Sequence, residues 1–244
     1  MLRRIAGNVV RTTRVMAPHS RAAMQSARRK AFIAQTRAAA TWNNATVDLR
    51  IDPDVRIGRG VRVTFEAWTH NVLHVGPGCS IDDGVLIQLK GGSVVLAERV
   101  ELRRNVVLNV AGRLVCEGDN PISWNSVIHC SNAVTLAPMV GLAEQVTIAD
   151  SSHYFTAPDD HFWHNVRVGE VHVGRNTWIC PKVTLARGAR VGAHCIVGSN
   201  SVVVGEVPDG SLASGVPVVI RPLTLPWATA APAPARTPRS AAGS

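Results

Sequence analysis

Three histidines lie close together in residues 150–170 of this 244-residue chain, in the segment DSSHYFTAPDDHFWHNVRVGE. An imidazole can take up and release a proton near neutral pH, so a histidine in such a segment can act as a general base. Asp150 lies three residues before His153, where a carboxylate could orient one ring nitrogen of that histidine if the chain bends between them. His161 and His164 flank a Phe-Trp pair and could contact a substrate.

A six-residue repeat follows this segment and predicts the fold that must position it. An aliphatic residue recurs at every sixth position from Val173 to Val203, and the residue four positions after it is small or of modest size. In an α-helix, residues six positions apart lie on different sides of the helix, and in a simple strand the side chains repeat every two residues. Neither element explains a period of six. A fixed internal repeat is typical of a solenoid. The hexads predict a triangular β-coil with one short strand on each side.

The same period runs upstream in three further frames. They cover residues 51–87, 94–106 and 122–146, with an aliphatic residue at nearly every sixth position. The 27 positions between Val146 and Val173 are not a multiple of six, which predicts that residues 150–170 loop out of the solenoid. Solenoids carry insertions on one face and often use them for binding.

The C-terminal repeats resemble a known family. The segment VHVGRNTWICPKVTLARGARVGAHCIVGSNSVVVGEVPDGSLASGVP, residues 171–217, resembles the last coils of hexapeptide-repeat acyltransferases, nearest to the maltose, galactoside and polysaccharide O-acetyltransferases. The resemblance implies an all-β, left-handed parallel β-helix for residues 46–221, with one extended loop and flexible termini. A left-handed coil is an exception to the usual right-handed crossover.

The resemblance also implies a reaction. Members of the family move an acyl group, here expected to be acetyl, from coenzyme A to a hydroxyl of a sugar or a similar small polar acceptor. No metal is expected. The family forms homotrimers, so each site is expected to take His153 from one chain and Trp178 from a neighbour.

Two acceptor-side residues are carried over from the family. His153 lies seven residues after Val146, at the offset of the family's catalytic histidine, and is expected to be the general base. Asn125, in ISWNSV, lies at about the place where relatives have a polar residue that binds the acceptor.

The donor side is expected on the last coils. Trp178 in NTWIC matches the Trp of the family's Trp-Ile-Gly signature, and Ser199 lies where the backbone meets the pantetheine arm. Three positions depart from the family: Cys180 replaces the signature glycine, and Gly205 and Val219 replace basic residues that meet the nucleotide phosphates.

Other basic residues could replace those lost phosphate contacts. The candidates are Lys182, Arg187 and Arg221. The cofactor-binding set is therefore expected to be Trp178, Cys180, Ser199, Lys182 and Arg221, with acetyl-coenzyme A as the co-substrate.

Charge is concentrated at the two ends of the chain. The formal net charge is +9, but residues 1–45 carry nine Arg or Lys and no acid, and residues 222–244 carry two Arg and no acid. The remaining 46–221 segment is slightly acidic. Such a body is not expected to bind nucleic acid, because a protein that follows a phosphate backbone is basic along its binding face.

The terminal segments have biased compositions. Residues 1–45 are rich in Ala and Arg and are interpreted as a basic extension, either helical after Pro18 or disordered. They lack the continuous apolar core of a secretory signal, so a cytoplasmic protein is expected, with membrane contact only through this segment. The Pro/Ala-rich residues 222–244 are interpreted as a flexible tail.

Two other functions compete with acyl transfer. A zinc hydratase of the same fold would need two histidines five residues apart, and the sequence has no such pair. A scaffold or glycan-binding β-helix with a degenerate donor site would explain the three departures from the family. The five cysteines are odd in number and show no Cys-x-x-Cys spacing, so they are expected to be reduced and structural.

Overall fold

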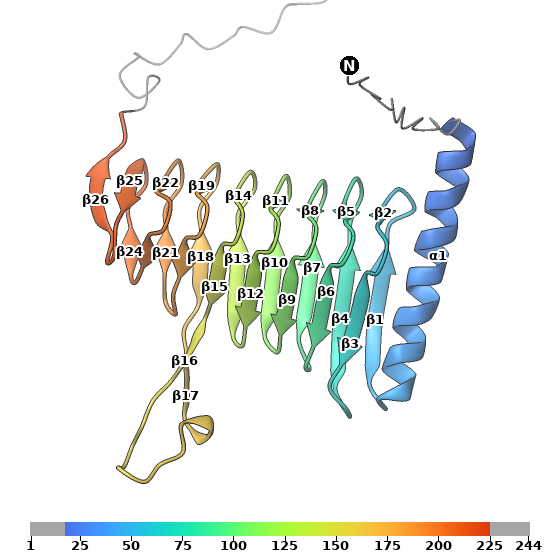
Figure 1. The fold of residues 1–244 in the computed structure, drawn as a ribbon, viewed down its shortest axis with the longest axis horizontal. Helices are drawn as coiled ribbons and strands as arrows, with labels where there is room; N and C mark the ends of the chain where they lie inside the picture. Colours follow the sequence, from blue (N-terminus) through green and yellow to red (C-terminus); the bar gives the residue numbers. More distant parts are fainter. Residues whose placement is uncertain (1–17, 225–244) are drawn as a thin grey trace, which may run out of the picture.

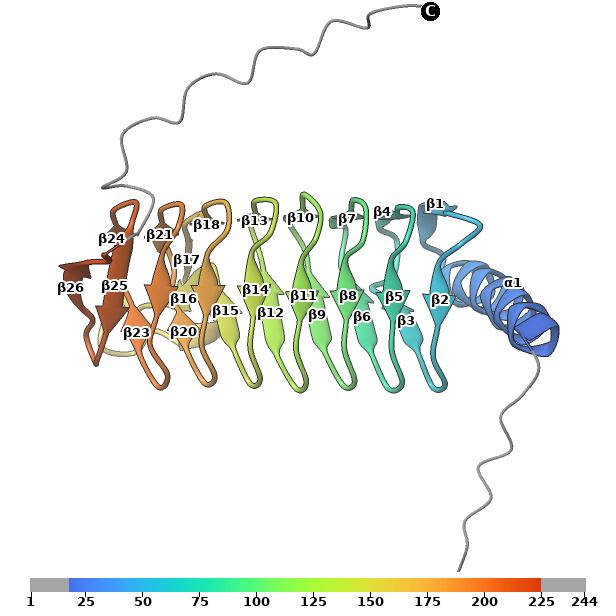
Figure 2. The same cartoon turned by 90° about the horizontal axis from the view of Figure 1, so that it is seen from above.

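Stacked β-coils form a long three-sided prism, closed at one end by a helix (Figures 1 and 2). The computed structural model describes residues 18–224. The three long sides are sheets, which we name faces A, B and C in the order in which the chain meets them. The predicted all-β, left-handed parallel β-helix is confirmed. Of the terminal segments expected from the sequence, residues 1–45 and 222–244, the parts 1–17 and 225–244 lie outside the described residues.

Each face takes one strand from every coil. Face A contains β1 (Thr46–Ile51), β4 (His70–Val75), β7 (Ser93–Leu96), β10 (Arg113–Cys116), β13 (Ala133–Leu136), β18 (Val171–Val173), β21 (Arg190–Val191) and β24 (Glu206–Val207). Face B contains β2 (Arg56–Ile57), β5 (Ser80–Ile81), β8 (Glu101–Leu102), β11 (Pro121–Ile122), β14 (Gly141–Leu142), β19 (Trp178–Ile179), β22 (Ile196–Val197), β25 (Ser211–Ser214) and the antiparallel β26 (Val219–Pro222). Face C contains β3 (Arg62–Phe65), β6 (Leu86–Leu89), β9 (Val107–Val110), β12 (Val127–Cys130), β15 (Thr147–Ala149), β20 (Thr184–Leu185) and β23 (Val202–Val203).

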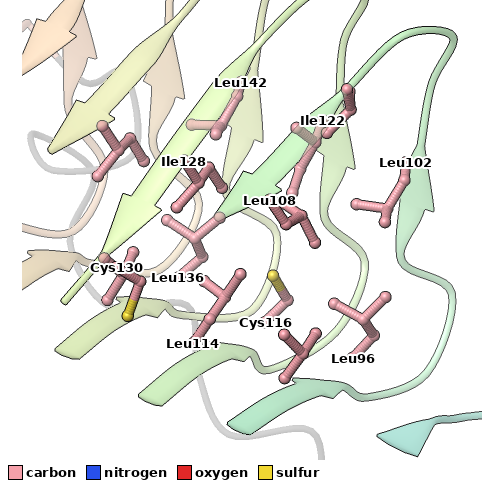
Figure 3. Close-up of a cluster of buried hydrophobic side chains, with 14 of the residues drawn as sticks. Leu96, Leu102, Leu108, Leu114, Cys116, Ile122, Ile128, Cys130, Leu136 and Leu142 are labelled. Carbon is pink, nitrogen blue, oxygen red and sulfur yellow. The ribbon is translucent and has the colours of Figure 1, made fainter. Parts of the chain in front are cut away.

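Columns of aliphatic side chains fill the interior of the prism. On face C, Ile128 pairs in register with Leu108 and Ile148, and on face B, Ile122 pairs with Leu102 and Leu142. All of these side chains are at most 1% exposed. Figure 3 shows the columns from different faces converging on the axis of the prism. Each buried Leu or Ile contributes roughly 1.5–3 kcal/mol from the apolar surface removed from water.

The upstream frame over residues 51–87 is confirmed as part of the columns, since Ile57 pairs with Ile81 and Val63 pairs with Ile87. The frames over residues 94–106 and 134–146 are displaced from the columns by two residues. Val94 pairs with Leu73 and Leu114, at the start of the face-A strands, whereas Leu96 continues the column of Val75. The valines of the frames over residues 94–106 and 134–146 therefore lie two residues before the column residues, at the starts of face-A strands or directly before the strands of faces B and C. They are buried, so the apolar period was informative even where its register was wrong.

One corner of the prism absorbs every change in coil length. We name it the C–A corner: the turns that lead from each face-C strand to the next face-A strand. The column residues of the other two steps stay six apart, as in Leu136, Leu142 and Ile148. At the C–A corner the step is eight residues from Ile128 to Leu136 and 25 residues from Ile148 to Val173. The extra residues broke the hexad count and shifted the apparent frames.

Helix α1 (Pro18–Trp42) covers the first coil. Its side chains Phe32, Thr36 and Ala40 are buried at helical spacing and close the open end of the core. The Arg29 side chain donates to the carbonyl oxygen of Pro53, in the first turn between faces A and B. An end coil of a solenoid has an uncovered interior, so a capping element is needed there. Residues 18–42 are thus part of the folded body.

The column on face A can be tested with one buried charge. Val191 is 1% exposed, and Val191→Asp places an unpaired carboxylate between Val173 and Val207. We expect a loss of more than about 3 kcal/mol of unfolding free energy, measured by urea denaturation. Val204→Asp is the control, because Val204 is 58% exposed on a neighbouring turn. Equal stability of the two variants would contradict the assigned column.

Candidate functional site

The longest turn at the C–A corner forms a projecting arm, residues 150–170. Strand β16 (Ser151–His153) pairs antiparallel with β17 (Val166–Val168), and the 3-10 turn η1 (Phe162–His164) lies between them. Figure 1 shows the arm extending below the prism, away from the strands of face B along the upper side. The predicted loop is therefore an ordered hairpin.

Asp150 holds the base of the arm. Its carboxylate is completely buried and accepts hydrogen bonds from the backbone N–H groups of Ser131 and Asn132, both at 2.7 Å. Its own N–H donates to the carbonyl of His129, and its carbonyl accepts from Gly169 N–H at 2.8 Å. Because these bonds join both ends of the arm to the preceding coil, Asp150 acts as an anchor. It makes no hydrogen bond to His153.

The ring of His153 is oriented inside the arm. Its Nδ1 lies 2.8 Å from the carbonyl oxygen of Phe162, and its ring meets Phe162 and Trp163 edge-on, with ring centroids 5.5 and 5.6 Å away. A carbonyl oxygen can only accept, so Nδ1 carries the proton in the neutral imidazole. Nε2 is then the basic nitrogen of an exposed side chain. Orientation of a basic imidazole by a second hydrogen bond is what a general base requires.

A carboxylate also orders the tip of the arm. Asp160 accepts from Thr156 N–H, from the Thr156 hydroxyl and from Asn165 Nδ2. These bonds, led by the Thr156 side chain, lower the pKa of Asp160. The hydrogen-bond network is therefore intact at pH values above the ordinary pKa range of Asp. It is lost as the pH falls through the lowered pKa of Asp160.

Asn125 lies at a different corner. It occupies the turn between β11 and β12 with φ 58°, in the left-handed region that Asn tolerates well. Its Oδ1 accepts from Asn105 Nδ2 at 3.2 Å, one coil away. The structure therefore places Asn125 in a column of turn residues between faces B and C, away from the arm.

Three of the donor-side residues are neighbours on the last coils. The Trp178 ring lies over Gly141, where a Cβ atom would be only 2.5 Å from it, and the side chain stays 45% exposed. Burial raises the pKa of the Cys180 thiol, and hydrogen bonds with the side chains of Trp178 and Ser199 partly oppose that rise. The thiol is therefore mostly protonated at neutral pH and is a weak nucleophile.

Lys182 and Arg221, the basic residues predicted to contact the phosphates, lie on either side of these residues. Arg221 lies on β26, opposite Leu212, at the end of face B. Lys182 has φ 60° in the turn that leads from face B to face C, and its N–H donates to Glu144. Both side chains are exposed and can contact an anion bound across the last strands of face B.

The two halves of the predicted site lie on opposite sides of one chain. His153 extends from the C–A corner, whereas Trp178, Cys180 and Ser199 lie on or beside face B, which is opposite that corner (Figure 1). One protomer therefore does not bring His153 together with Trp178, Cys180 and Ser199. The sequence missed the Phe162 carbonyl that orients His153, and also the bond from Arg187 Nε to Ser152 Oγ at 3.0 Å.

The described residues offer no conventional metal site. Among residues 18–224, no group of three or more His, Cys, Asp or Glu side chains is arranged to hold a metal ion. All five cysteines are free, and burial raises the pKa of Cys116 and Cys130 to about 12. Within the described part of the chain, no helix is long and apolar enough to span a membrane.

Comparison with known proteins shows which family model the repeat matches. Residues 170–205 match the family described as bacterial transferase hexapeptide (six repeats). Residues 170–205 therefore carry the hexapeptide repeat of this family. This hexapeptide-repeat protein is 38% identical, over 181 residues, to "Probable acetyltransferase Rv3034c" of Mycobacterium tuberculosis; the match covers 72% of the chain and 53% of the relative. The chain thus spans about half the length of that relative.

Two further matches concern sugar-modifying enzymes. The hexapeptide-repeat protein is 27% identical to the "Putative lipopolysaccharide biosynthesis O-acetyl transferase WbbJ" of Escherichia coli, over 53% of the chain and 71% of the relative. The fold is similar to that of the polysialic acid O-acetyltransferase OatWY, with a TM-score of 0.59 at 19% identity, covering 73% of this chain and 84% of that one.

Removal of the anchor carboxylate should destabilise the arm and the coil below it. Asp150→Ala leaves the N–H groups of Ser131 and Asn132 without their acceptor, which costs about 1–3 kcal/mol of unfolding free energy. Urea denaturation and limited proteolysis of the arm measure the two effects. Asp159→Ala at the exposed tip is the control. A loss below about 0.5 kcal/mol in Asp150→Ala would contradict the anchoring role.

Alkylation of Cys180 tests whether this thiol lies in the predicted binding site for acetyl-coenzyme A. Cys180 is the only cysteine that is not buried, so iodoacetamide should label it first in the native protein, faster as rising pH forms the thiolate. Acetyl-coenzyme A should slow this labelling by covering the thiol. Denatured protein, in which all five thiols react, provides the reference. A labelling rate that is unchanged by saturating acetyl-coenzyme A would remove Cys180 from the donor site.

Proposed function

We propose that the protein transfers an acetyl group from acetyl-coenzyme A to a hydroxyl group of a sugar or a similar polar acceptor, with His153 as the general base. One observation supports this role most directly. The Phe162 carbonyl holds Nδ1 of His153 and leaves Nε2 as an exposed base, on an ordered arm of a hexapeptide-repeat β-helix.

The proton movements follow from that geometry. A hydroxyl is a poor nucleophile at neutral pH, so Nε2 of His153 takes its proton as the oxygen attacks the thioester carbonyl. The imidazolium then returns the proton to the sulfur of the departing coenzyme A as the carbon–sulfur bond breaks. The Phe162 carbonyl keeps the ring in place and stabilises the transient positive charge.

The donor is proposed to lie across the end of face B. Trp178 presents an exposed ring to the pantetheine arm, with Cys180 and Ser199 beside it. Arg221 and Lys182 supply positive charge for the phosphates, where Gly205 and Val219 cannot.

A homotrimer would unite the two halves of the site. The arm of one protomer would bring His153 to face B of its neighbour, and cyclic symmetry would repeat this contact three times. The separation of His153 and Trp178 within one chain supports this arrangement. We also propose a cytoplasmic location, since the donor is an intracellular metabolite and all five cysteines are free.

A non-catalytic glycan-binding β-helix is the second candidate. The observation that favours it is the set of departures on the donor side, Cys180, Gly205 and Val219. A calorimetric titration with acetyl-coenzyme A separates the two functions without any acceptor. Binding at about one site per chain supports the transferase, and a folded protein that does not bind the donor supports the second candidate.

Replacement of the base tests the mechanism. His153→Ala should lower the rate of acetyl transfer about 10²–10⁴-fold, while acetyl-coenzyme A still binds, because the proposed donor contacts are made by other side chains. His172→Ala, a histidine of β18 on face A, is the matched control and should keep its activity. Activity of His153→Ala within a few-fold of the wild-type protein would exclude His153 as the base.

A further inference from the structure

The two faces of the arm point in opposite directions along the prism. Ser152 alternates with Ser151 and His153 on β16, so it lies on the opposite face of the arm from the candidate base. Ser151 Oγ accepts a hydrogen bond at 3.1 Å from Ser131 Oγ, in the turn of the preceding coil. Ser152 Oγ accepts one at 3.0 Å from Arg187 Nε, in the turn of the following coil. His153 therefore faces the earlier coils, and the face that carries Ser152 meets the later coils.

Two arginines lie on the face that meets the later coils. Arg167 is directly opposite Ser152 on the paired strand β17, and its guanidinium carbon lies 4.2 Å from the centre of the Tyr154 ring. The Arg187 side chain passes over Gly169, where a Cβ atom would lie only 3.1 Å from its Cγ. A cation–π contact holds one guanidinium group in place, and a serine hydroxyl holds the other.

The two guanidinium groups are close together, and we name Arg167 and Arg187 the arginine pair. Arg187 is bonded at Ser152, and Arg167 contacts Tyr154, which is two residues further along the same chain. Two residues of extended chain span about 7 Å. Because both groups also lie on one face of the arm, an anion placed between them can contact both.

The later coils leave the arginine pair open to solvent. Residues 186–189 form the next turn at the C–A corner, and residues 204–205 form the turn after it, which is two residues shorter. A Cβ atom added to Gly188 or to Gly205 would meet no atom within 4 Å. The side chains of both arginines are exposed, so a ligand can reach them from this side.

Most acidic side chains of this region are bound elsewhere. Asp150 is buried against the preceding coil, and Asp160 is bonded within the tip of the arm. Glu170 pairs with Arg190 at 3.4 Å. Within residues 18–224, neither arginine of the pair forms a salt bridge with any acid. The two other acids near this face are Asp159 and Glu206.

We propose that the arginine pair binds a phosphate group at the base of the arm. A guanidinium group forms paired hydrogen bonds with phosphate or carboxylate oxygens. A carboxylate offers only two oxygens, which one guanidinium group already satisfies. A phosphate monoester has three acceptor oxygens and close to two negative charges, so it can be shared between two guanidinium groups. Two fixed guanidinium groups without acidic partners therefore favour phosphate over carboxylate.

Either substrate of the proposed transferase can carry this phosphate. Coenzyme A has a 3′-phosphate on its nucleotide, and a sugar acceptor can be phosphorylated. The site lies on the opposite face of the arm from His153, so the phosphate takes no part in the proton transfer. The inference depends on the contacts of the arm alone and is independent of the transfer reaction.

Site-resolved chemical modification tests the arginine pair. Phenylglyoxal reacts with accessible arginines, and peptide mass spectrometry on the full-length protein gives a rate for each of them. Saturating inorganic phosphate should slow the modification of Arg167 and Arg187 about tenfold or more, relative to chloride at equal ionic strength. Arg104, which is exposed in the turn between β8 and β9, is the control and should react at an unchanged rate.

A single substitution tests whether the two side chains act together. In Arg167→Gln, phosphate should protect Arg187 about twofold or less, because one guanidinium group remains to hold it. Arg167→Lys keeps the charge without the planar fork and should restore only part of the protection. Arg104→Gln is the matched control and should keep full protection. Limited proteolysis verifies that the arm stays folded in each variant.

Two organic phosphates distinguish the sources of the group. Adenosine 3′,5′-bisphosphate represents the nucleotide end of coenzyme A, and glucose 6-phosphate represents a phosphorylated sugar. Adenosine and glucose are the uncharged references and should give no protection. The phosphate that protects the arginine pair more strongly at equal concentration identifies the substrate that carries the group.

Three results would overturn the proposal. Unchanged modification of the arginine pair in phosphate, equal protection of Arg104, or full protection of Arg187 in Arg167→Gln would each exclude a shared phosphate site. Dissociation of the oligomer by Arg167→Gln in sedimentation would make the pair a subunit contact instead. Failure of acetyl-coenzyme A to bind, while inorganic phosphate still protects the pair, would contradict the proposed transferase but not this site.

Discussion

Coil-to-coil stacking of one buried aliphatic side chain per strand is the constraint on which the rest of the structure depends. Ile128 between Leu108 and Ile148 is one example, and the same register recurs on all three faces. Parallel strands of adjacent coils satisfy their backbone groups only in this register, so the apolar columns and the hydrogen bonds specify the same stacking. Two of the three corners consequently keep a step of six residues throughout.

The third corner is free to vary, and the candidate chemistry lies there. Longer turns leave the C–A corner without disturbing the columns, and the longest becomes the arm that carries His153. Asp150 makes this projection compatible with a folded prism, because its buried carboxylate joins the start of the arm to the turn of the coil below. Fixed columns and one variable corner explain how a repetitive core can present a specific site.

The sequence predicted the repeat and the loop well, because both follow from local periodicity. It placed the column wrongly in the middle coils, because Val134 stands six residues after Ile128 and continues the hexad, whereas the column residue is Leu136, eight residues after Ile128. It assigned Asp150 to His153 from their proximity, whereas burial directs that carboxylate to Ser131 and Asn132. The capping role of α1 depends on contacts with the first coil that no local pattern reveals.

In the proposed homotrimer, the base and the donor surface of one site belong to different chains. Mixed oligomers of His153→Ala and Trp178→Glu chains, each inactive alone, separate this arrangement from a site within one chain. Random assembly should restore about one quarter of wild-type activity, because about one cleft in four then combines an intact arm with an intact face B. Mixed oligomers that form, as verified by mass spectrometry, but stay inactive would contradict a site shared between protomers.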